Sequence, residues 1–177
     1  MTSFLKTLAA AATLAGAALA SGGAAGGALM TGKAAPEFTG IDKWLNSEPL
    51  TMQQLGGKVV LVDFWTYTCI NCINTLPFVK SWHQKYKDQG LVVIGVHTPE
   101  FPFERSTDKV RTALKRFEIG FPVAQDNRYL TWSAYNNQYW PAFYLIDKKG
   151  RVAYTHFGEG RYAQTEAAIA ALLAQKD

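Results

Sequence analysis

Two continuous runs of aliphatic residues, separated by one helical pattern, constrain the fold of this chain more than any other feature. Residues 58–64 (KVVLVDF) and 91–96 (LVVIGV) each have the composition of a strand that is buried on both faces of a sheet. The large apolar residues between the two runs recur at helical spacing: Leu76, Val79, Trp82 and Tyr86. A strand, a helix over about 69–86 and a second strand form a βαβ unit, which predicts an α/β fold.

The patterns that follow extend this unit into one domain. The elements expected there are a helix over 107–117, an extended piece over 121–124, a short helix over 129–135, a β-hairpin of 142–146 and 151–155, and a helix over 165–174. We therefore expect a central mixed sheet with helices on both faces.

Composition excludes several classes of protein. The chain has 177 residues, of which 48% are hydrophobic and 18% are charged, as in a globular protein with one substantial core. Its net charge of +4 is spread along the chain without a dense block of lysine and arginine. Nucleic-acid binding favours a clustered basic stripe, so we expect no nucleic-acid partner.

The first residues have the pattern of a secretory signal. Lys6 is followed by an uncharged stretch, residues 7–32, which is rich in alanine, glycine and leucine, and Ala18-Leu19-Ala20 resembles a cleavage site. An uncleaved membrane anchor is the alternative, because the stretch is long enough to span a bilayer. Both interpretations place the domain outside the cytoplasm, in the periplasm or an equivalent compartment, where disulfide chemistry is possible.

These observations predict three segments along the chain. They are a signal peptide over 1–20, a flexible lead-in over 21–35 that is rich in glycine and alanine, and one folded domain over 36–177.

The chain contains only two cysteines, Cys69 and Cys72, which lie between the first strand and the helix. A structural zinc site needs four ligands, but there is no second cysteine pair and the three histidines are scattered through the sequence. A structural disulfide that closes so short a loop would remove little entropy from the unfolded chain. A redox-active pair that opens a helix after a buried strand fits the pattern best, and we expect no metal and no cofactor besides this pair.

The position of the two thiols assigns each a role. At the start of the helix, the Cys69 sulfur is within reach of the backbone N–H groups of Asn71 and Cys72 and of the Cys72 thiol, and these hydrogen bonds favour the thiolate. We therefore expect Cys69 to be the exposed nucleophile. Cys72, one turn into the helix, is then the buried thiol that resolves the mixed disulfide.

Asp63 lies inside the first apolar run, six residues before Cys69. Between Val62 and Phe64 it should be at least partly buried, with a raised pKa. Such a carboxylate near Cys72 is suited to accept the Cys72 proton. The alternative is a carboxylate at a strand end that pairs with a lysine.

Longer motifs carry a resemblance to a known family. Residues 62–72 (VDFWTYTCINC) resemble the active-site stretch of thioredoxins, with Asp63 in the buried position of that family. Residues 140–143 (WPAF) resemble the cis-proline loop. Residues 95–101 (GVHTPEF) and 156–160 (HFGEG) resemble the TlpA/DipZ-type branch. The similarity extends from about residue 36 to the C-terminus.

The resemblance implies a thioredoxin fold with an insertion between the βαβ unit and the hairpin. It implies that the peptide bond before Pro141 is cis, and that the backbone at this position pairs with substrate. Trp65 and Trp140 are expected to flank the cysteines as an apolar docking surface. Ile70 and Asn71 are expected to touch substrate, and they depart from the Gly-Pro of thioredoxin and the Pro-His of DsbA-type oxidants.

Three further residues have two interpretations each. His97 and Glu100 follow the second strand, where open α/β sheets place ligands, and are expected either to shape the rim of the site or to stabilise the loop. His156 is expected to be a histidine at a strand end, with a metal ligand as the alternative.

The resemblance also implies a function, because members of this branch are exported or membrane-tethered and many are reductants. We expect a monomeric thiol–disulfide oxidoreductase that reduces client proteins and receives electrons from a membrane donor of the DsbD/CcdA type. A thiol peroxidase is one alternative, because Thr66 and Cys69 have the T-x-x-C spacing of peroxiredoxins, although Val62 stands where that motif has proline. A Sco-like copper-handling module that uses Cys69, Cys72 and His156 is the other.

Overall fold

The computed structural model describes residues 30–176. The signal peptide expected over 1–20 and the first part of the lead-in, 21–29, lie outside these residues. Within the described part, no helix combines the length and the hydrophobicity that crossing a bilayer requires.

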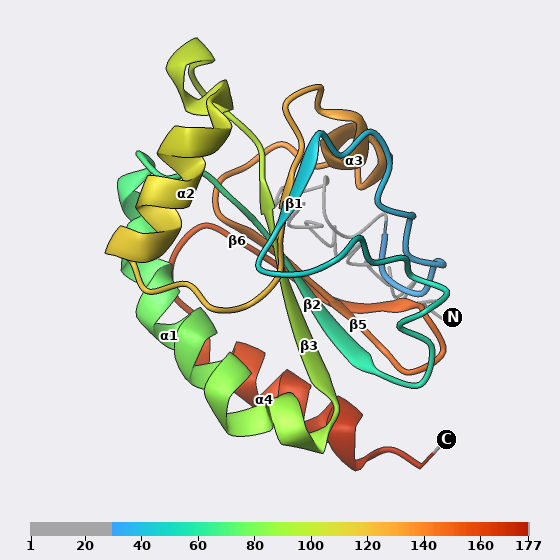
Figure 1. The fold of residues 1–177 in the computed structure, drawn as a ribbon. Helices are drawn as coiled ribbons and strands as arrows, with labels where there is room; N and C mark the ends of the chain where they lie inside the picture. The colour runs from blue at the N-terminus through green and yellow to red at the C-terminus, as the bar shows by residue number, and fades with distance from the viewer. Residues whose placement is uncertain (1–29, 177) are drawn as a thin grey trace, which may run out of the picture.

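A six-stranded mixed sheet forms the centre of the domain, in the order β1-β4-β3-β2-β5-β6 (Figure 1). The strands are β1 (Lys43–Leu45), β2 (Val59–Trp65), β3 (Leu91–His97), β4 (Val123–Gln125), β5 (Ala142–Ile146) and β6 (Val152–Phe157). Strands β2, β3 and β4 are mutually parallel, whereas β5 runs antiparallel to both β2 and β6. The mixed sheet predicted from the sequence is therefore confirmed.

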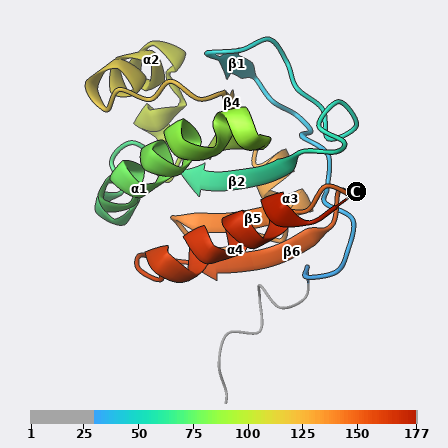
Figure 2. The same ribbon diagram turned by 90° about the horizontal axis from the view of Figure 1, so that it is seen from below.

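Helices cover both faces of this sheet (Figures 1 and 2). They are α1 (Ile70–Tyr86), α2 (Thr107–Arg116), α3 (Leu130–Ala134) and α4 (Tyr162–Ala174), with two 3-10 turns, η1 (Lys87–Gln89) and η2 (Pro102–Arg105). Apolar residues of α1, α2 and α4 share one core cluster, and those of α3 belong to the cluster on the opposite face. The predicted arrangement of layers is confirmed.

Strand β2 is completely buried, and its residues alternate between the two cores. Val62 and Phe64 pack in the core on the α3 side, while Leu61 and Trp65 pack in the core on the α1 side. Because side chains alternate along a strand, Asp63 also faces α1. The strand thus places one carboxyl group beneath the helix that carries the cysteines.

Gly95 of β3 is the partner of Asp63 in the sheet. A Cβ atom at position 95 would lie 2.9 Å from Nε1 of Trp65 and 3.1 Å from Cε2 of Phe121. Glycine at this position therefore makes room for the Trp65 ring inside the core.

The folded domain begins before residue 36. Met30 is buried, and the amide of Gly32 donates to the carbonyl of Val152 over 2.7 Å. An isolated bridge joins Ala34 to Arg151. The described part of the expected lead-in, residues 30–35, is therefore packed along the edge of the sheet beside β6.

Candidate active site

Three connections meet at the carboxyl ends of β2 and β3. The first leads from Trp65 to Cys69, the second follows β3, and the third precedes β5, where the register of Phe64 with Ala142 brings Pro141 to the same end of the sheet. Thr98 joins them, because its amide donates to Trp65 O over 3.1 Å and its carbonyl accepts from Trp140 Nε1 over 3.0 Å. The Trp140–Pro141 peptide bond is cis.

Cys69 is the N-cap of α1. Its Sγ accepts a hydrogen bond from the Cys72 amide over 3.2 Å, and the Cys72 Sγ donates to it over 2.7 Å. Both residues are free thiols; Cys69 is half-buried and Cys72 is fully buried. Only Cys69 is therefore accessible to a substrate.

The same contacts separate the acidities of the two thiols. The hydrogen bond from the Cys72 thiol lowers the pKa of Cys69 to about 7; burial opposes this shift, and the amides of Cys72 and Asn71 support it. The pKa of Cys72 is raised, first by burial and then by its hydrogen bond to Cys69. At pH 7 about half of the molecules therefore carry one negative charge on the pair, centred on Cys69.

Asp63 is completely buried, and neither of its carboxylate oxygens makes a hydrogen bond within the described part of the chain. Burial raises its pKa to about 8, and the charge of Cys69 adds to the shift. The charge of Asp63 in turn raises the pKa of Cys72, so the two groups interact electrostatically. The raised pKa inferred from the sequence agrees with this environment.

The two tryptophans occupy different environments. Trp65 is 1% exposed and belongs to the core on the α1 side, so it offers no docking surface, contrary to expectation. The reason is the alternation along β2, which turns position 65 inward. Trp140 is half-buried and packs on Trp132, with 4.1 Å between ring centroids.

The residues between the cysteines are accessible. Ile70 is 64% exposed, and Asn71 is exposed beside it. On the opposite connection Pro141 is buried, whereas Trp140 is partly exposed.

His97 does not lie at a rim, because its side chain is fully buried. Its ring stacks on Tyr67, with 5.5 Å between centroids, and its Nε2 lies 3.3 Å from Thr66 Oγ1. Burial lowers the pKa of His97 to about 4, so the ring is neutral at neutral pH. Glu100, in contrast, is exposed, and its charge raises the pKa of Cys69.

Glu104 of η2 is a further buried residue at this site, and it was not among those predicted from the sequence. Its carboxylate is fully buried and accepts a hydrogen bond of 2.5 Å from Thr68 Oγ1, one residue before Cys69. A glutamate in a four-residue turn gave no sequence signal of burial, because one of its donors, the Thr68 hydroxyl, lies 36 positions away along the chain.

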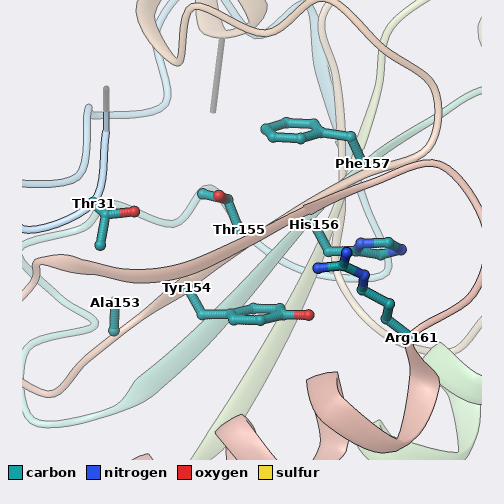
Figure 3. A pocket seen from close by; sticks show the side chains of 7 residues that line it. All are labelled: Thr31, Ala153, Tyr154, Thr155, His156, Phe157 and Arg161. Atoms are coloured by element: carbon teal, nitrogen blue, oxygen red, sulfur yellow. The ribbon is translucent and has the colours of Figure 1, made fainter. Parts of the chain in front are cut away.

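His156 belongs to the edge strand β6 and lines a cavity of about 490 Å³ (Figure 3). Its Nε2 is 3.3 Å from the carbonyl oxygen of Glu159, and Figure 3 shows the Arg161 side chain next to its ring. Among residues 30–176, no group of three or more potential ligands is arranged to hold a metal ion.

With this geometry described, comparison with known proteins assigns the family. Residues 30–173 match the Redoxin family model. The chain belongs to the Redoxin family.

Individual relatives refine this assignment. This redoxin domain is 50% identical to protein DipZ of Mycobacterium bovis over 78% of its own length and 20% of that protein, and thus spans about a fifth of this relative. It is 31% identical to the thiol-disulfide oxidoreductase YkuV of Bacillus subtilis, covering 80% of this chain and 95% of that one. A solved structure described as a putative thiol:disulfide interchange protein DsbE from Chlorobium tepidum has a TM-score of 0.70 and 27% identity, over 81% of this chain and 98% of its own. The resemblance to the TlpA/DipZ-type branch and to the thioredoxin fold is confirmed.

The buried Asp63 predicts a pH-dependent stability effect. In the unfolded chain this group ionises near its ordinary pKa of 3.8, whereas in the folded protein it stays protonated up to about pH 8. The folded state is therefore destabilised, relative to the unfolded chain, as pH rises from about 4 to about 8. We expect Asp63→Asn to change the free energy of unfolding little at pH 4 and to increase it by several kcal/mol at pH 8, with an upper limit of about 6 kcal/mol.

Urea denaturation of the reduced protein at both pH values measures this effect. Asp88→Asn, at an exposed position in η1, is the control and should give no pH-dependent gain. An equal effect of Asp63→Asn at pH 4 and pH 8 would show that burial does not hold the carboxyl group protonated.

Proposed function

We propose that this redoxin domain is an extracytoplasmic thiol–disulfide oxidoreductase that reduces disulfides in client proteins. The observation that carries the proposal is the accessible Cys69 sulfur at the N-cap of α1, with the buried Cys72 thiol 2.7 Å away. The names of YkuV and of the DsbE neighbour support the same chemistry.

The reaction proceeds in two exchanges. The Cys69 thiolate attacks one sulfur of a client disulfide, forms a mixed disulfide and releases the other client sulfur as a thiolate. Cys72 then loses its proton and attacks the Cys69 sulfur, which releases the second client sulfur and leaves the Cys69–Cys72 disulfide. Two electrons pass to the client, and the domain must be reduced again before the next cycle.

Asp63 acts as the base in the second exchange. While Cys69 is a thiolate, its charge helps to keep Asp63 protonated. Formation of the mixed disulfide removes that charge, so the pKa of Asp63 falls at the step in which Cys72 must give up a proton. The carboxylate is then available to accept it.

The acidity of Cys69 favours a reductant over an oxidant. Strong oxidants of this kind have a nucleophilic cysteine with a pKa near 3.5, which stabilises their reduced form, whereas thioredoxin has a value of about 7. The pKa of Cys69, at about 7, matches the second group. Ile70, Asn71 and Trp140 would contact the client, with the backbone at Pro141 pairing with its chain.

The cellular context is part of the proposal. The sequence pattern of residues 1–20 supports export, with membrane tethering as the alternative. A membrane donor of the DsbD/CcdA type would supply electrons to the monomeric domain, as the resemblance to the TlpA/DipZ-type branch implies.

Neither alternative gains a supporting observation. A peroxidase would use the Thr66 hydroxyl at the nucleophilic sulfur, but this hydroxyl lies in the buried layer against His97 Nε2. A copper module would use His156, which contacts the carbonyl of Glu159.

The roles of the two cysteines predict opposite trapping behaviour. Cys72→Ser leaves the Cys69 nucleophile but removes the resolving thiol, so stable mixed disulfides with clients should accumulate. Cys69→Ser leaves only the buried thiol and should trap nothing. Non-reducing electrophoresis after incubation with oxidised insulin measures this; trapping by Cys69→Ser would reverse the assignment.

The direction of electron flow predicts a low reduction potential. Equilibration of the wild-type protein with glutathione buffers, followed by quantification of both redox forms, should give a value nearer to about −270 mV, as in thioredoxin, than to about −120 mV, as in DsbA. A value near the higher figure would contradict the reductant role and leave the exchange chemistry intact.

A further inference from the structure

Glu104 is a buried carboxylate without a positive partner. Its side chain is fully buried, yet none of the salt bridges formed within residues 30–176 involves it. An isolated charge is costly to bury, so such a group is normally neutral or surrounded by donors. The proposed exchange reaction makes no use of it.

The Glu104 carboxylate is surrounded by donors. Thr68 Oγ1 donates to Oε1 over 2.5 Å, and the amides of Glu100 and Phe101 donate to Oε2 over 2.6 and 2.9 Å. Burial alone would raise its pKa, but these bonds, with one from the Thr66 hydroxyl, hold the pKa below its ordinary value. The group is therefore ionised at neutral pH.

Two of these donors lie in the turn that ends at Cys69. The Cys69 amide donates to the Thr66 carbonyl over 3.4 Å, which closes the turn. Thr68 is exposed, and within residues 30–176 the hydrogen bond of its side chain is the one to Glu104. The Glu104 carboxylate thus links Thr66 and Thr68, the first and third residues of the turn, to η2. Thr68 and Glu104 are 36 positions apart in the sequence.

The orientation of Cys69 depends on this turn. Its Sγ accepts the Cys72 amide only while the residue remains in the extended N-cap conformation, with φ −71° and ψ 111°. A hydrogen bond to the preceding residue, anchored in a buried group, restrains that conformation. The same carboxylate also accepts a hydrogen bond from the Glu100 amide. This bond restrains Glu100, whose negative charge raises the pKa of Cys69.

We propose that Glu104 is a positioning residue for the nucleophile, which holds the turn from Thr66 to Cys69 so that the Cys69 sulfur stays at the N-terminus of α1. The proposal rests on the proposed role of Cys69 as nucleophile, but its test needs no turnover. A simple charge effect predicts the opposite sign, because removal of a nearby negative charge would make the Cys69 thiolate more stable.

The test compares the thiolate titration of Glu104→Gln and Thr68→Val with that of the wild-type protein, followed by the absorbance of the thiolate at graded pH. Glu104→Gln removes the charge and the acceptor pattern, and Thr68→Val removes one donor while leaving the charge in place. We expect both to raise the midpoint of the Cys69 titration, by about one pH unit for Glu104→Gln, which reduces the thiolate fraction at pH 7 about fivefold. Thr68→Ser retains the hydroxyl and should restore the wild-type midpoint.

Glu48→Gln, at an exposed position, is the control for the loss of one negative charge and should leave the midpoint unchanged. An unchanged midpoint in Thr68→Val, with or without a lower melting temperature, would overturn the proposal and reduce Glu104 to a structural role. A lowered midpoint in Glu104→Gln with a normal one in Thr68→Val would assign Glu104 a charge effect instead. Thr68 is exposed, so its variants test the proposal even if Glu104→Gln fails to fold.

Discussion

The hydrogen bonds that converge on the Cys69 sulfur are the interaction on which the rest of this site depends. A thiol at the N-cap receives the Cys72 amide and the Cys72 thiol at once, and both favour its ionised form. The contact also makes the pair asymmetric, because the donor thiol becomes harder to ionise as the acceptor becomes easier. Nucleophile and resolving thiol are thus distinguished by position on one helical turn.

Three titratable side chains are buried around this site, and burial and hydrogen bonding together give them different charges. Asp63 has no donor within the described chain and holds its proton to about pH 8, whereas Glu104 accepts two backbone and two hydroxyl donors and is ionised. His97 is neutral because burial lowers its pKa. Strand β2 therefore supplies a potential proton acceptor near Cys72, Asp63, and η2 supplies a fixed charge at the turn before Cys69, Glu104. Hydrogen bonding decides which buried acid is ionised.

Long patterns in the sequence predicted most of the fold, whereas two of the short elements, β1 and η2, were not predicted. The two aliphatic runs and the helix between them identified β2, α1 and β3, because continuous burial leaves few alternatives. Strand β1 has three residues and η2 has four, too few to establish a period. The expected docking role of Trp65 was wrong, and of the two interpretations of His97 the rim position does not hold, because a strand buried on both faces has no polar alternation to show which residues stay inside. Burial of Glu104 could not be predicted because one of its donors, the Thr68 hydroxyl, lies 36 positions away along the chain.

The central claim is that one sulfur of the pair is selectively ionised by its place at the start of α1. Alkylation of the reduced wild-type protein at graded pH, with each cysteine followed separately by mass spectrometry, tests it directly. We expect Cys69 to react with a midpoint near pH 7 and Cys72 to stay unmodified across the neutral range. If the alkylation of both thiols instead shows the midpoint of free cysteine, about pH 8.5, the account is contradicted.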